Sequence, residues 1–246
     1  MHLIPSMSPR LLALALLLLL GRMAPIHAAD FPKHFALAPD STSPNGRYAV
    51  LVPVWDPEKG GEPAVDCLFD LRTGKALGDL VGNPGCDRRL NHIEVMPSRW
   101  SADNSLLLWF VGGKWFPYAY VVAHMQSGKL LWQVDLLAEA QKAILARTKA
   151  AAPERYAAAK KANDGWGSAY PEGFTVDVKA ALPLTLPLKV RAVLTSNPKE
   201  IEAPDMPNLD SSLEAVVDKD GKFTVTSFRL EKENAYNGDA WQQLAQ

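Results

Sequence analysis

The chain has 246 residues, with 26 lysines and arginines against 27 aspartates and glutamates, so its formal net charge is −1 with the histidines neutral. A chain with this balance lacks the basic excess that proteins use to hold nucleic-acid phosphates, so the composition gives no support for a nucleic-acid partner. The length is enough for one sizeable domain or two small ones.

Residues 1–28 have the order of a secretory signal peptide. Arg10 supplies a positive charge, residues 11–20 are all apolar, and the small residues Ala28 and Ala29 mark where cleavage would fall. The apolar run is about half the roughly 20 residues that span a bilayer, and Arg22 ends it, so a retained anchor is the weaker interpretation. We expect a periplasmic or extracellular mature chain with no integral membrane segment.

Residues 29–134 contain one pattern twice. A tight turn followed by a strand occurs at 43–50 and again at 101–108, and each copy is followed by a Gly-Lys turn, at 71–75 and 125–129. Such duplication indicates a repeated meander of short strands, whose residues are explained by turn geometry and sheet packing. The strands expected in this region are 47–53, 68–71, 106–111, 115–123 and 130–134.

The character of the sequence changes at Asp135. Residues 136–149 are mostly good helix formers, Leu137, Ala140 and Ile144 fall on one stripe, and Asp135 can cap the first turn. Pro153 ends this helix, and a second short helix is expected over 154–162. We therefore assign 135–165 to a helical insertion.

Strands return in the third region, residues 166–246. They are expected at 174–178, 188–195, 213–218 and 222–230, and Asp220-Gly221 forms the turn of the last hairpin. The predicted fold class is mainly β, built from antiparallel, propeller-blade-like meanders with an inserted helical hairpin, or α+β if the helices pack on the sheet. The sequence leaves open whether this region shares one domain with residues 29–134.

The repeated turns carry a resemblance to a known family. The segments 43–46 and 100–104, followed by 70–75 and 124–129, resemble the repeats of TolB-type and WD40-like β-propellers. In that family the motif sets the hairpin turns of a four-stranded blade, and most members are scaffolds for partners, although some carry enzyme domains. The resemblance covers residues 42–134, about two blades, whereas a closed propeller needs at least about four. An incomplete or divergent propeller and a smaller meander with the same turns both fit, and we favour the meander.

Cys67 and Cys86 are the only cysteines. An even count in an exported chain favours a disulfide, which would close a loop of about 20 residues and stabilise the fold by roughly 3 kcal/mol. The alternative is two separate buried thiols. The pair lacks the spacing and the neighbouring histidines of a zinc site, and we expect neither a metal nor a cofactor.

Aromatic residues gather in the hairpin of the second repeat. Trp115, Phe116, Tyr118 and Tyr120 are candidate ligand-binding residues, because exposed aromatic rings stack on sugars or anchor a protein partner. Alternation places Phe116, Tyr118 and Tyr120 on one face of their strand, and Pro117 indicates that this strand lies at a sheet edge. The alternative is that these rings fill the core.

Other polar residues give weaker signals. The histidines of the mature chain, His34, His92 and His124, lack an accompanying nucleophile elbow or metal-binding motif, so we predict no catalytic residue. The paired carboxylates Glu200 with Glu202 and Asp218 with Asp220 lack the regular oxygen ligands of a calcium loop. Residues 139–161 carry six cations and two carboxylates, which would suit anionic lipid or an acidic partner, although a solvated helix face is the usual outcome.

Together these patterns predict an exported, non-catalytic binding or interaction module of a bacterial-type cell envelope, whose partner is a protein or a glycan. One alternative is a secreted hydrolase whose serine, histidine and aspartate are assembled in space. Another is an inhibitor of a secreted enzyme. An exposed strand edge would also allow copies of the chain to pair as a homo-oligomer.

Overall fold

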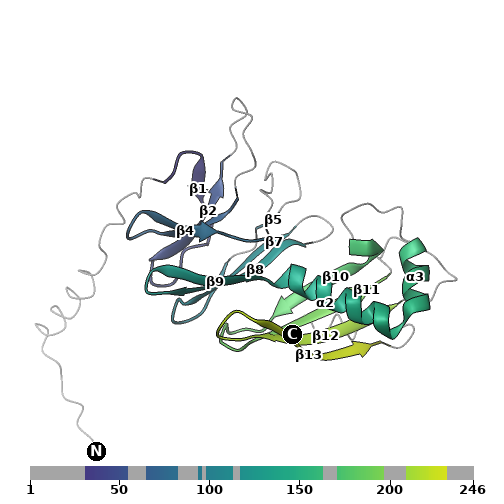
Figure 1. Cartoon of the computed structure of the whole chain (residues 1–246). Helices are drawn as coiled ribbons and strands as arrows, with labels where there is room; N and C mark the ends of the chain where they lie inside the picture. The colour runs from purple at the N-terminus through teal and green to yellow at the C-terminus, as the bar shows by residue number, and fades with distance from the viewer. Residues whose placement is uncertain are drawn as a thin grey trace, which may run out of the picture.

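The computed structural model describes residues 31–54, 65–82, 94–95, 98–112, 117–162, 171–196 and 209–231. These residues form three antiparallel sheets and two α-helices (Figure 1). The signal peptide expected over residues 1–28 lies outside the described residues. The prediction of a mainly β fold with inserted helices is confirmed.

The first sheet has four strands in chain order, namely β1 (Phe35–Leu37), β2 (Tyr48–Pro53), β3 (Cys67–Asp70) and β4 (Lys75–Asp79). The turn before β2 is held by its own side chains: Ser43 Oγ donates to Asn45 Oδ1 at 2.8 Å and accepts from the backbone N of Tyr48 at 2.9 Å. Side chains that bond to nearby backbone in this way favour turns over regular structure. The chain therefore enters β2 in a defined direction.

The second sheet consists of β5 (Glu94–Val95), β6 (Arg99–Trp100), β7 (Leu106–Gly112), β8 (Pro117–Gln126) and β9 (Lys129–Asp135). Its order is β5-β7-β8-β9, with β6 also paired to β7. The turn before β7 has equivalent bonds, because Ser101 Oγ donates to Asp103 Oδ1 at 2.6 Å and accepts from the backbone N of Leu106 at 2.8 Å.

The edge position predicted from Pro117 is wrong, because β8 lies between β7 and β9. Pairing of β8 with β9 begins only at Val121. Pro117 is the first residue of β8 and pairs only with β7, where Gly112 lies opposite it. A proline is tolerated there because no second strand needs its missing backbone N–H.

The helices α2 (Leu136–Ala151) and α3 (Pro153–Ala162) follow β9 directly. Asp135 caps α2 as predicted, since its Oδ1 accepts a hydrogen bond from the backbone N of Ala138 at 3.1 Å. The stripe of Leu137, Ala140 and Ile144 is buried, as the spacing predicted. After the short 3₁₀ turn η1 (Pro171–Gly173), the third sheet contains β10 (Thr175–Ala180), β11 (Leu188–Thr195), β12 (Asp210–Val217) and β13 (Phe223–Leu230), in that order.

The hairpin β7–β8 is buried on both faces. Leu107 and Val121 belong to a core shared with the first sheet, whereas Leu108 and Val122 belong to a core shared with α2, α3 and strands β10 to β12. Figure 1 shows α2 running across the C-terminal sheet, which it contacts at all four strands. The helices therefore pack on the C-terminal sheet, and the α+β alternative named in the sequence analysis is the one that applies.

The division of the chain into residues 29–134, 135–165 and 166–246 stays a prediction, although one hydrophobic core contains residues from all three regions.

Candidate anion-binding groove

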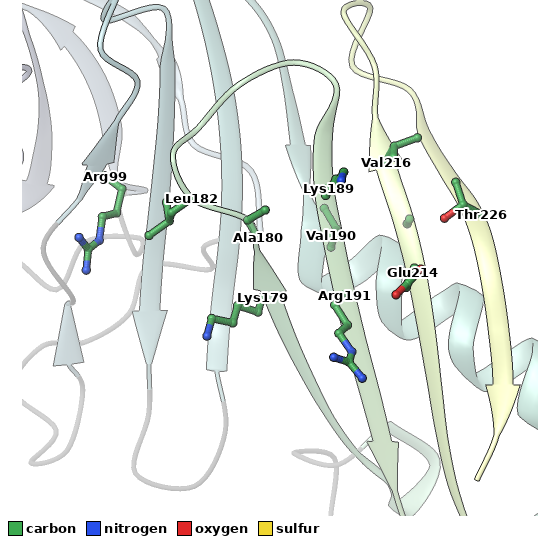
Figure 2. Close-up of a pocket in the computed structure, with 12 residues that line it drawn as sticks. Arg99, Lys179, Ala180, Leu182, Lys189, Val190, Arg191, Glu214, Val216 and Thr226 are labelled. Carbon is green, nitrogen blue, oxygen red and sulfur yellow. The ribbon is translucent and has the colours of Figure 1, made fainter. Parts of the chain in front are cut away.

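A groove of about 680 Å³ lies over the C-terminal sheet, beside β6 (Figure 2). Ala192 and Leu213 are buried in the core with α2, so the residues that alternate with them point to the opposite face. This opposite face forms the groove. The residues that line it are Arg99, Lys179, Ala180, Ala181, Leu182, Lys189, Val190, Arg191, Glu214, Ala215, Val216 and Thr226.

The strand register brings cations together on this face. Lys179 on β10 lies directly opposite Arg191 on β11, and Lys189 precedes Arg191 by two positions on the same strand. Figure 2 shows these side chains on neighbouring strands. Like charges directly opposite each other in a sheet are destabilising. The pair of Lys179 and Arg191 therefore adds repulsion, which Glu214, opposite Arg191 on its other side, offsets in part.

Arg99 adds a fourth cation from the neighbouring sheet. Its strand, β6, pairs with β7 opposite Leu108, and its side chain is exposed at the groove. Leu182, which follows β10, is 53% exposed and offers an apolar surface near the cations. The groove is thus formed by both sheets, and its shape depends on how they are joined.

One carboxylate lines the groove. Glu214 on β12 lies opposite Arg191 in the register and accepts a hydrogen bond from Ser227 Oγ at 3.3 Å through Oε2. Four cations thus face one acid in a chain whose net charge is −1. Guanidinium and ammonium groups form charge-assisted hydrogen bonds with carboxylate, phosphate and sulfate oxygens. Of the described residues that line the groove, only Thr226 carries a hydroxyl, and none is a histidine or cysteine.

Two of the four predicted aromatic site residues lie on β8, and the other two, Trp115 and Phe116, lie outside the described residues. Tyr118 is 37% exposed. Tyr120 is half-buried: its ring lies edge-on to Phe110, and its hydroxyl accepts a hydrogen bond from the backbone N of Ala180 at 3.1 Å. Tyr120 thus serves the junction between the sheets, while the ligand-binding role of all four residues stays a prediction.

Trp132 on β9 makes a second contact with the C-terminal sheet. Its indole Nε1 donates to the carbonyl oxygen of Lys219 at 2.9 Å, and its ring lies against Gly221 in the turn between β12 and β13. The ring of His124 lies 5.1 Å from that of Trp132 at a tilt. Sequence reasoning did not identify this contact, because the two segments are 87 residues apart and share no motif.

The predicted disulfide stays a prediction. Cys67 is buried on β3, and burial, with smaller contributions from Asp79 and Asp66, raises the pKa of its thiol to about 11. Cys86 lies outside the described residues, as do His92, Glu200 and Glu202. No group of three or more histidine, cysteine, aspartate or glutamate side chains suited to a metal ion occurs in the described part of the chain.

The hairpin turn at Asp220-Gly221 is confirmed. Asp218 Oδ1 accepts from the backbone N of Asp220 and of Lys222, each at 2.9 Å, so its carboxylate is engaged by the turn. On the helices, Lys160 pairs with Glu172 at 3.0 Å, which neutralises part of the predicted basic patch. None of the helices within the described ranges is long and apolar enough to cross a membrane.

Comparison with known proteins gives no relative: no protein-family model, no curated protein and no solved structure matches the chain. The groove must therefore be interpreted from its own residues. Lys189 and Arg191 alternate along the predicted strand 188–195, whereas Lys179 follows the predicted strand 174–178 and lies on β10 because the structure extends that strand to Ala180. The register that sets Lys179 against Arg191, and the approach of Arg99, depend on the tertiary fold.

Proposed function

We propose that the chain is an exported, non-catalytic binding module that holds an anionic partner in the groove over the C-terminal sheet. The observation that carries the proposal is the set of four cations, Arg99, Lys179, Lys189 and Arg191, around a cavity with one carboxylate. Clefts lined by one sign of charge attract ligands of the opposite sign and raise their local concentration. The signal-peptide pattern supports a partner outside the cytoplasm.

The two lysines of the groove differ from a cation that serves structural pairing. Lys179 and Lys189 form no ion pair within the described part of the chain. By contrast, Arg47 pairs with Asp70 at 2.9 Å, in the turn region where a cation supports the fold. The groove lysines are therefore available to a ligand.

Retention on a heparin resin tests the proposal, with the Lys179→Glu, Lys189→Glu double variant beside the wild type. We expect this variant to elute at clearly lower salt, because exposed charges that attract a ligand are screened by ions. The matched control changes two exposed lysines outside the groove and outside the basic helices, Lys75→Glu and Lys129→Glu, and has the same net charge. Equal shifts in both variants would show that retention follows total charge and would refute the groove.

A further inference from the structure

We infer that the occupant of the groove is an extended acidic segment of a protein partner, with carboxylates at alternate positions. This inference rests on the proposed function, because it names the partner of the same groove. It depends on three features of the lining: the spacing of the cations, the chemistry of the floor, and the place of the single acid.

The spacing of the cations matches an extended peptide. Lys189 and Arg191 are two positions apart on β11, so they lie on one face, about 6.8 Å apart at the strand rise of about 3.4 Å per residue. An extended peptide likewise presents alternate side chains on one face with this repeat. Acidic side chains at positions i and i+2 can therefore contact both cations, and Lys179, opposite Arg191, adds a third contact beside them.

The floor of the groove favours a peptide over a sugar. The apolar lining residues that lie outside the core are Ala181, Leu182 and Val216, whereas Ala180, Val190 and Ala215 are buried in the core on the other face of the sheet. No aromatic ring occurs among the described residues of the lining. Sugar rings are commonly held by stacking on aromatic faces, which this surface does not offer. Apolar side chains between the acidic residues of a peptide can instead contact Leu182, which is 53% exposed.

Glu214 limits where negative charge fits. It lies on β12, beside Arg191 and on the side away from Lys179. A polymer with an anion on every unit would bring some of its charge near this carboxylate, which weakens its binding without preventing it. A peptide that runs along β11 can keep its carboxylates over β10 and β11 and carry neutral or basic side chains on the side of β12.

Fluorescence anisotropy with labelled peptides tests the inference on the full mature protein. The probes are a peptide that alternates glutamate and valine, an isomer of the same composition with its glutamates contiguous, and an oligogalacturonate of the same charge. We expect the alternating peptide to bind most tightly. Lys189→Gln should weaken its binding roughly fivefold, as for an exposed ion pair, and Glu214→Gln should strengthen binding of the contiguous isomer. Circular dichroism shows whether each variant is folded.

The outcomes separate the two proposals. Equal binding of both peptides would overturn the inferred spacing. Tighter binding of the oligogalacturonate would overturn the peptide partner and leave the anion-binding function standing. Binding of any probe that is unchanged by Lys189→Gln and by Lys179→Gln in folded protein, or no binding of any probe, would refute both the inference and the proposed function.

Discussion

The hydroxyl of Tyr120 on β8 accepts a hydrogen bond from the backbone N of Ala180, the last residue of β10, at 3.1 Å. This bond joins the second sheet to the third at the edge of the groove, where Ala180 is part of the lining. A second bond joins the same two sheets at another place, where the indole N–H of Trp132 on β9 donates to the carbonyl oxygen of Lys219. Two aromatic side chains of the second sheet thus hold backbone atoms of the third, and they help to set the place of Arg99 relative to Lys179.

Tyr120→Phe removes the acceptor and keeps the ring. We expect it to lower the free energy of unfolding by about 1 to 3 kcal/mol, because a partly buried backbone N–H is left without its partner. Urea unfolding followed by fluorescence measures this. Tyr48→Phe is the control, since the buried Tyr48 ring stacks on Trp100 and its hydroxyl makes no hydrogen bond within the described residues. Equal losses in the two variants would contradict the role of the bond.

The local elements were predictable because their causes are local. Asp135 caps α2, and the strand 188–195 has the predicted bounds, because capping and strand patterns depend on neighbouring residues. The double burial of β7–β8 and the position of β8 inside its sheet were not predictable, since they depend on which elements pack together. For the same reason the cations of the groove were missed: nothing near Arg99 in the sequence indicates that β10 lies beside it.

Gly221 supports the second junction, and its substitution tests the contact with Trp132. Gly221 has a φ of +79°, and a Cβ there would lie 2.8 Å from Cδ2 of Trp132. We expect Gly221→Ala to cost about 2 to 5 kcal/mol of unfolding free energy, from about 1 to 2 kcal/mol of left-handed strain and a further 1 to 3 kcal/mol for the forced shift of the ring. Thermal unfolding followed by circular dichroism measures the loss.

Gly46→Ala separates the two terms of that cost. Gly46 has a φ of +69°, but no heavy atom would lie within 4 Å of its Cβ, so only the strain applies. We expect the loss at Gly46 to be the smaller of the two. If both substitutions cost the same, the close approach of Trp132 does not contribute.

The cysteines can be tested by alkylation of the protein, purified without reductant, in denaturant with and without a reductant. We expect no alkylation before reduction and two labels after it, as a Cys67–Cys86 disulfide requires. Two labels without reductant would contradict the bridge. In that case the folded protein should react slowly at Cys67, because burial keeps its thiol protonated, with a pKa of about 11, and the thiolate is the reactive form.

Asp177 makes the stability depend on pH in a direction that can be tested. Burial raises the pKa of its carboxyl from 3.8 to about 6, and its Oδ2 is buried with no hydrogen-bond partner in the described structure. The folded protein therefore holds this proton more tightly than the unfolded chain. The resulting stabilisation is complete below about pH 4 and is lost as the pH rises through about 6.

Asp177→Asn removes that titration, because the amide stays neutral. We expect the variant and the wild type to have similar melting temperatures at pH 4, and the variant to melt higher at pH 7, where the wild type buries a charged carboxylate. Asp218→Asn is a control for which the opposite result is expected. Hydrogen bonds, chiefly the one from the backbone N of Lys222, lower the pKa of the Asp218 carboxyl. Its substitution should therefore lower the stability at pH 7 and have little effect at low pH. A melting difference for Asp177→Asn that stays constant from pH 4 to 7 would show that this carboxyl keeps its ordinary pKa in the fold.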